Sequence, residues 1–187
     1  MLSHNEEARL LAACTGRRAH LRALLVCALD TAMRRGELFK LQWRDVDLYT
    51  REITITVMNS KTARPRKVAM TPRVYEALEM LRRDAPPGGE SLVFGITDTV
   101  KKSFAAACKA AGVDGFRFHD CRHTAITRMI QAGITPMEVM KVSGHTQINT
   151  FARYINPNSQ AVKRAADTLA AFNAQAGTHE TSVELVN

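Results

Sequence analysis

The segment from His20 to Met33 constrains the fold more than any other part of this chain. Its sequence, HLRALLVCALDTAM, is apolar over most of the surface that a helix would present. A helix that is hydrophobic nearly all round is stable in water only when it is buried. We therefore expect a buried helix at the centre of one domain, or of one domain with a tail.

Most of the other patterned segments are typical of helices. The alternating, β-branched run Arg51–Val57 predicts a strand and Arg66–Met70 a returning strand, so that Lys61 lies at a hairpin tip. Thr-Pro pairs and glycines mark several helix starts and stops. Helices are expected at Glu6–Cys14, Arg35–Leu41 (a turn entering a short helix), Thr71–Asp84, Asp98–Ala111, His119–Ala132, Thr135–Ser143, from about Thr150, and Asn158–Gln175, with a strand-like stretch at residues 91–94.

The charge balance indicates an anionic partner. The formal charge is +8 and the pI is near 9.7. A basic protein without a nucleic-acid partner is the alternative, but many of the cations gather around the polar motifs described below, which favours nucleic acid. The side chains assigned to DNA contacts on this ground are Arg35, Arg64, Arg66 and Lys67.

The four cysteines form no CxxC pair and no regular framework, which is typical of a reduced, intracellular protein. The amino-terminal residues MLSHNEEARLL lack the layout of a signal peptide, and no apolar run approaches membrane-spanning length. These features predict a cytoplasmic, nucleoid-associated protein without a membrane partner.

Two basic residues have settings that suit them to contact a phosphate. Arg34 follows the apolar helix in TAMRRGEL, and Glu37 is placed to hold its guanidinium. A cation favoured by the helix dipole is the alternative for Arg34. Lys61, at the hairpin tip, is suited to protonate a leaving oxygen, a role worth roughly 10²–10⁴-fold in rate. A solvated surface lysine is the alternative.

The second half of the chain supplies two histidines, an arginine and a tyrosine. His119 and Arg122 are three residues apart and share a helix face. His145 and Tyr154 follow, and a phenol beside arginines can act as a nucleophile. Capping or core roles are the alternatives for His119 and Tyr154. His123 also permits a metal interpretation, but no third ligand or base is in register, so we expect no metal.

Together these motifs resemble the catalytic domain of the tyrosine recombinases, the bacteriophage-integrase family. The resemblance runs from about Glu6 to Arg164 through TAMRRGEL, KTARPRKVAM, HDCRH and SGHTQINTFARY. It departs at four positions, which are Ala32, Ala69, Cys121 and Ser143. The resemblance implies an α+β, mostly helical fold around a small antiparallel sheet. It assigns catalysis to Arg34, Lys61, His119, Arg122, His145 and Tyr154, with Glu37 in support.

The resemblance also implies a reaction and its partners. Tyr154 would attack a scissile phosphate in double-stranded DNA, giving a 3′-phosphotyrosine and a free 5′-hydroxyl without metal, ATP or another cofactor. Arg34 and Arg122 would offset the transition-state charge, His145 would donate to a non-bridging oxygen, and His119 would assist proton transfer. Family members act as tetramers on DNA, so we expect a homo-tetramer there and weak association without it.

Residues 1–176 are expected to form the catalytic domain, and residues 177–187 a tail available for subunit contact. No amino-terminal core-binding domain fits before Glu6, so we expect a catalytic fragment with weak, salt-sensitive DNA binding. Three rivals remain open: type IB topoisomerase-like cleavage and rejoining without strand exchange, a catalytically silent DNA-binding module, and a metal-dependent nuclease.

Overall fold

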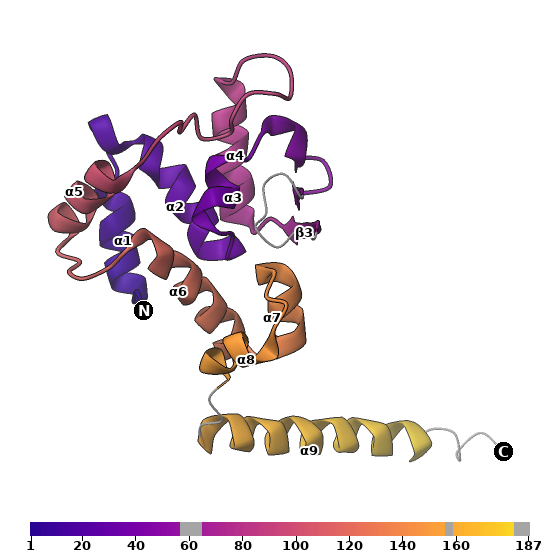
Figure 1. Cartoon of the computed structure of the whole chain (residues 1–187). Coiled ribbons are helices and arrows are strands. Elements are labelled where there is room, and N and C mark those ends of the chain that lie inside the picture. Colours follow the sequence, from indigo (N-terminus) through magenta and orange to yellow (C-terminus); the bar gives the residue numbers. More distant parts are fainter. Residues whose placement is uncertain (57–64, 156–158, 182–187) are drawn as a thin grey trace. The chain divides into compact units, whose positions relative to one another are not determined.

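The computed structural model describes residues 1–56, 65–155 and 159–181. The chain divides into two compact units, Met1–Tyr154 and Ile155–Asn187. The first unit contains the sheet and the hydrophobic core (Figure 1). The second contains one long helix, α9 (Ser159–Thr181), which runs beyond the predicted end at Gln175.

Helix α2 (His20–Thr31) is the predicted buried helix, and its burial is confirmed. Eight of its twelve residues are buried. It packs against α4 (Pro72–Arg83) and α6 (Phe118–Gln131). It ends at Ala32, whose φ of 53° lies in the left-handed region. Glycine adopts that conformation more easily than alanine, so this helix end is a strained position for Ala32.

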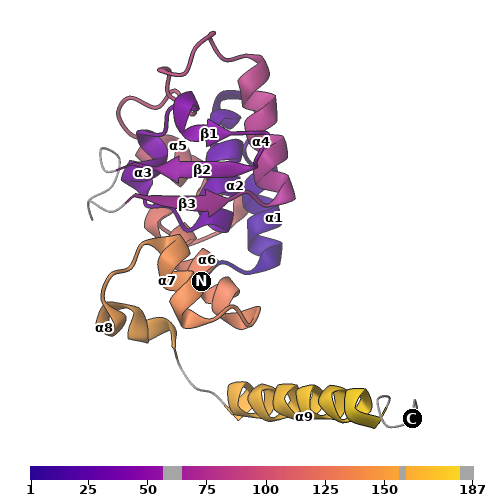
Figure 2. The same ribbon diagram turned by 90° about the vertical axis from the view of Figure 1, so that its right-hand side faces the viewer.

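The sheet has three antiparallel strands in the order β1-β2-β3, namely β1 (Val46–Asp47), β2 (Glu52–Ile55) and β3 (Arg66–Ala69). Figure 2 shows the strands side by side in front of the helical layer. Ile53 and Ile55 alternate with less buried residues and point into the core. The predicted antiparallel pairing of β2 with β3 is confirmed, while the predicted tip with Lys61 lies outside the described residues. Strand β1 was not predicted, because two residues are too few to form a detectable alternating pattern.

The strand expected at residues 91–94 does not form. Leu92 makes a single isolated bridge with Gln42, and the surrounding residues lie in bends. Val93 is nevertheless buried, and its N–H donates to the Leu41 carbonyl. The strand prediction was therefore wrong, because the facing segment Leu41–Trp43 pairs with this stretch over a single bridge and then enters the 3₁₀ turn Trp43–Asp45.

The amino-terminal helix α1 (His4–Ala12) is tied to α4 and α6 by charge. The carboxylate of Glu7 is buried and accepts hydrogen bonds from Arg73 of α4 and Arg128 of α6. Arg128 also donates to the Leu2 carbonyl, and the Leu2 N–H donates to the Thr124 hydroxyl. These bonds hold the start of the chain against the helix that carries His119 and Arg122.

Four further helices complete the first unit. They are α3 (Arg35–Phe39), α5 (Lys101–Ala111), α7 (Pro136–Ser143) and α8 (Ile148–Phe151), with 3₁₀ turns at Gly16–Arg18, Trp43–Asp45 and Ala152–Tyr154. Thr71 and Thr135 cap α4 and α7 as predicted, and Gly112 ends α5. Within the described residues, no helix has the length and apolar character needed to cross a membrane.

Candidate active site

Arg34 lies immediately before α3, and its position is fixed by Glu37 and Gly144. The Arg34 N–H donates to Glu37 Oε2 over 2.7 Å, and its Nη1 donates to Oε1 over 3.1 Å. Its Nη2 donates to the Gly144 carbonyl over 2.9 Å. The arginine therefore joins the start of α3 to the end of α7, and the predicted pairing with Glu37 is present.

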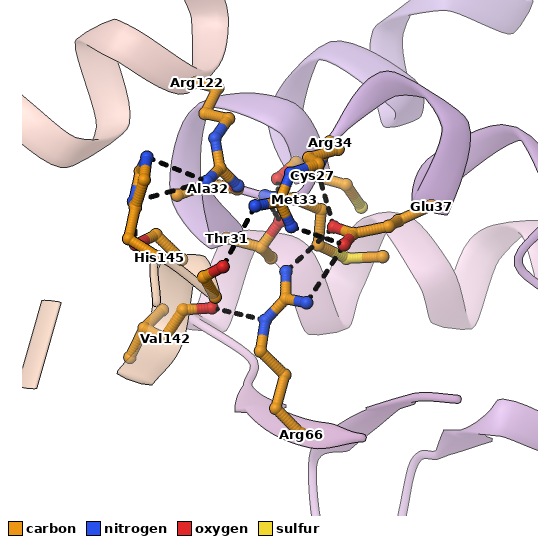
Figure 3. A network of polar contacts seen from close by, with 12 residues as sticks. Cys27, Thr31, Ala32, Met33, Arg34, Glu37, Arg66, Arg122, Val142 and His145 are labelled. Atoms are coloured by element: carbon orange, nitrogen blue, oxygen red, sulfur yellow. Dashed lines mark hydrogen bonds and ion pairs between the residues drawn. The ribbon is translucent and has the colours of Figure 1, made fainter. Parts of the chain in front are cut away.

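Arg66 differs from its predicted role as a DNA contact. Its side chain is only 9% exposed, and Nη1 and Nη2 donate to the two carboxylate oxygens of Glu37 over 3.0 and 2.8 Å. Its Nε donates to the Val142 carbonyl over 2.8 Å. Figure 3 shows this guanidinium rising from β3 between Glu37 and Val142. All three of its nitrogens point inward, so the structure corrects the sequence-based assignment.

Glu37 is a buried carboxylate shared by two arginines. Burial by itself would raise its pKa, but the hydrogen bonds and charges of Arg66 and Arg34 outweigh that effect and lower the pKa. The carboxylate is therefore ionised at neutral pH. A buried ion that is paired on both oxygens fixes its partners in position, so Glu37 orients the arginine that faces the site.

Gly144 allows the end of α7 to approach Arg66 closely. Its φ is 71°, and a Cβ built there would lie 2.9 Å from Arg66 Nη1. Both the conformation and the space favour glycine at this position. The tight turn directs the Gly144 carbonyl to Arg34 and the next residue, His145, to Arg122.

Arg122 is the second arginine of the site and lies on the buried face of α6. It is 5% exposed, its Nη1 donates to the Ala32 carbonyl, and its Nη2 lies 3.4 Å from both ring nitrogens of His145. Burial, with repulsion from Arg34, lowers its pKa to about 10, so it remains charged at neutral pH. Arg34 and Arg122 therefore place two positive charges beside one another, as Figure 3 shows.

His145 is held between Arg122 and Ser143. Ser143 Oγ lies 2.8 Å from His145 Nδ1 and 2.6 Å from the Val139 carbonyl. The hydroxyl proton satisfies the carbonyl, so Nδ1–H of His145 donates to Oγ, and the unprotonated Nε2 faces Arg122 Nη2 at 3.4 Å. Burial first, and then the charges of Arg122 and Arg34, lower the pKa of His145 to about 4. Without an anion in the site this imidazole is neutral.

Tyr154 ends the 3₁₀ turn that follows α8, rather than lying in a continuous helix from Thr150 as predicted. Its ring packs against Phe151 and His145, with centroid separations of 5.3 and 6.1 Å. Burial raises its pKa, and the charges of Arg122 and Arg153 only partly offset this. The positive surroundings expected to ionise the phenol are present, yet the phenol is neutral.

The Tyr154 hydroxyl is hydrogen-bonded to Nδ1 of His123, a residue that the sequence had suggested only as a possible metal ligand. His119 is exposed, and its ring lies edge-on to His123 with centroids 5.0 Å apart. The signal that could have identified His123 is its place next to Arg122 and one helical turn from His119. In the residues that the structure describes, no group of three His, Cys, Asp or Glu is arranged to hold a metal.

Comparison with known proteins identifies the family to which this fold and site correspond. Residues 1–161 match the phage integrase family. The chain belongs to the phage integrase family. The resemblance inferred from the motifs is thus confirmed.

Curated relatives of this integrase-family chain include the shufflon-specific DNA recombinase of Escherichia coli. It is 28% identical over 195 residues, which cover 100% of this chain and 49% of the relative. The integrase of Salmonella phage P22 is 26% identical over 82% of this chain and 42% of the relative. The chain therefore spans about half the length of the curated relatives it matches.

The predicted fold class is also confirmed by solved structures. The catalytic domain of bacteriophage HP1 integrase has a TM-score of 0.70 at 23% identity, over 89% of this chain and 93% of that one. The Tn1549 transposon integrase in complex with transposon right end DNA has a TM-score of 0.73 at 21% identity, over 90% of this chain and 65% of that one. At these identities the likeness concerns the fold.

Of the remaining predicted residues of this integrase-family chain, two lie outside the described residues and two are exposed. Lys61 and Arg64 lie outside the described residues. Arg35 is exposed on α3, and Lys67 is exposed on β3 with its ammonium 2.7 Å from Glu52. The structure thus brings together Arg34, Glu37, Arg122, His145 and Tyr154, with His119 beside them through His123.

Proposed function

We propose that this chain is the catalytic domain of a tyrosine recombinase that cleaves and rejoins DNA through a 3′-phosphotyrosine. The convergence of Arg34, Arg122 and His145 beside Tyr154 is the observation that carries the proposal. Two fixed guanidinium groups can pair with the non-bridging oxygens of a phosphate. The phenol at the same place can attack the phosphorus, while the phosphotyrosine keeps the bond for rejoining.

Each group of the site then has a role. Arg34, oriented by Glu37, and Arg122 offset the negative charge that develops on the phosphate. His145 donates to a non-bridging oxygen once it is protonated, and Lys61 protonates the leaving 5′ oxygen. His119 serves as the base when a 5′-hydroxyl of another strand attacks. The set needs neither metal nor ATP, because the charge stabilisation and the proton transfers come from side chains.

The proposed partner is double-stranded DNA in the cytoplasm, at the nucleoid. The net charge of +8 supports this, as does the Tn1549 transposon integrase being solved with transposon DNA. Arg35 and Lys67, both exposed, are proposed backbone contacts together with Arg64. We propose residues 1–176 as the catalytic domain and a homo-tetramer as the active assembly on DNA, with residues 177–187 available for subunit contact.

The test is covalent capture of the protein on a nicked suicide duplex in EDTA. The cognate sequence is obtained by selecting bound duplexes from a random pool, and the products are resolved on a denaturing gel. A protein–DNA adduct is expected from the unmodified chain and from Tyr49→Phe, whose ring is exposed, and its loss from Tyr154→Phe. No adduct, even with a DNA-clamping domain attached at the amino terminus, would favour a silent DNA-binding module.

One rival shares this chemistry and is separated by its products. A type IB topoisomerase-like activity cleaves and rejoins one duplex without exchanging partners. Incubation of two DNA duplexes that carry the site distinguishes the two, because a recombinase yields exchanged products and the rival does not.

A further inference from the structure

The environment of the Tyr154 hydroxyl raises the question of which group removes its proton. An oxygen nucleophile must lose its proton as it bonds to phosphorus, and a phenol at its reference pKa of about 10 keeps that proton at neutral pH. Burial raises the pKa of Tyr154 further. The arginines nearby, Arg122 and Arg153, carry only donors and cannot accept a proton. A neutral acceptor is therefore required.

Among the described residues, His123 is the one whose ring nitrogen is hydrogen-bonded to the Tyr154 hydroxyl. The two rings lie 5.7 Å apart by centroid, from α6 and from the turn Ala152–Tyr154. In the tautomer that carries its proton on Nε2, the neutral imidazole accepts from the Tyr154 hydroxyl at Nδ1. His145 is less well placed, because its Nδ1 is engaged by Ser143, its Nε2 faces the Arg122 guanidinium, and its ring lies 6.1 Å from that of Tyr154. His119 is exposed and contacts the His123 ring instead.

The groups around His123 keep it in the accepting form. Burial, and after it the charges of Arg153 and Arg122, lower the pKa of His123, against the opposing effect of Asp120. His119 on the same helix and His145 after α7 also face it. The imidazole is therefore neutral at neutral pH and ready to take a proton.

We propose that His123 is a further catalytic residue, the base that accepts the Tyr154 proton during DNA cleavage. The inference rests on the proposed function. The proton passes from Tyr154 Oη to His123 Nδ1 as the Oη–P bond forms and the P–O5′ bond breaks. The leaving 5′ oxygen takes a proton from Lys61. In rejoining, the imidazolium of His123 returns its proton to the departing phenolate.

The test compares single-turnover cleavage of two nicked suicide duplexes, one with the natural 5′ oxygen and one with sulfur at that bridging position. The chain is used with a DNA-clamping domain attached if it needs one. His123→Asn retains an acceptor for the phenol but cannot take the proton, and His123→Ala removes both functions. His20→Ala, at an exposed histidine, is the matched control. Thermal melting of each variant separates loss of chemistry from loss of fold.

We expect both His123 variants to cleave roughly 10²–10⁴-fold more slowly, the usual contribution of a general base. Because a thiolate leaves without a proton, the sulfur duplex should rescue Lys61→Ala and leave both His123 variants slow. Imidazole in solution should restore part of the rate of His123→Ala, which a merely structural role would not allow.

Cleavage by His123→Asn within about threefold of the unmodified chain would overturn the proposal, as would its rescue by the sulfur duplex. Either result leaves the proposed function intact, because Tyr154 would still form the adduct. Absence of any adduct from the unmodified protein would instead defeat the proposed function, and the role of His123 with it.

Discussion

His145 is neutral in the free protein because it shares its surroundings with two arginines. Burial, Arg122 and Arg34 lower its pKa to about 4. A phosphate between those arginines would cancel much of their repulsion and favour the imidazolium, whose Nε2–H could then donate to the anion. Binding of the anion and protonation of His145 should therefore be coupled.

This coupling predicts that an anion raises the pKa of His145. Titration of the His145 ring proton by NMR should give a pKa of about 4 without ligand, and a value at least one unit higher with a DNA duplex or with sulfate. At a pH between these two pKa values, the protein takes up a proton when the anion binds. The ring signal of the exposed His20 reports the general effect of salt. An unchanged His145 titration would show that the arginines do not hold the anion beside it.

At the scale of single residues, the sequence predicted which residue types form the site more reliably than it predicted where each side chain lies. Arg34, Glu37 and Arg122 occupy the expected places because their motifs sit at helix ends and on one helix face. Arg66 was misassigned because a strand residue in a basic run resembles a surface cation, while its partner Glu37 is 29 residues away in the sequence. His123 was undervalued because its contact with Tyr154 depends on a turn that local patterns do not specify.

At the scale of elements, Arg66 is a junction between β3, α3 and α7. It binds both oxygens of Glu37 and the Val142 carbonyl. Removing one partner of a buried ion pair leaves the other charge under-compensated, which costs about 3 kcal/mol or more. Since Glu37 also orients Arg34, the effect should reach the site.

We therefore predict that Arg66→Met lowers the free energy of unfolding by about 3 kcal/mol, measured by urea denaturation. The matched control is Arg44→Met, whose salt bridge to Glu90 is exposed on both sides. Loss of that bridge should cost less than about 1 kcal/mol.

The pKa of Glu37 is lowered by folding, so the contribution of Glu37 to stability is full above the unfolded pKa of about 4.3. That contribution disappears as the pH falls through the folded pKa, and Arg66→Met should weaken this acid dependence. Equal losses in the two variants would contradict the proposed junction.

Helix ends were the most predictable elements, because their signals are local. Thr71 and Thr135 accept from the helix N–H groups three residues on, and Gly112 takes the left-handed conformation. The stretch at residues 91–94 was the least predictable. Whether an apolar run becomes a strand depends on the length of its partner, and the facing segment Leu41–Trp43 pairs with it over one bridge before a 3₁₀ turn begins.

At the scale of the whole molecule, α9 carries an apolar stripe without a described partner. Val162, Leu169 and Phe172 are between 60% and 68% exposed, and their spacing places them within one side of a helix. Burying side chains of this kind contributes about 1.5–3 kcal/mol each. Two occupants fit such a stripe: another subunit of an assembly on DNA, or the first unit of the same chain.

Replacing Val162, Leu169 and Phe172 together by serine separates these two. If the stripe binds another subunit, the variant should keep its melting temperature, while the mass of the DNA complex by light scattering falls from that of the tetramer to that of single subunits on each site. Three lost contacts correspond to roughly a thousandfold or more in dissociation constant. Lys163→Ser with Asp167→Ser, on the opposite side of α9, should leave the complex unchanged. A lower melting temperature with an intact complex would instead mean that α9 packs within its own chain, so that tetramer contacts must be sought elsewhere.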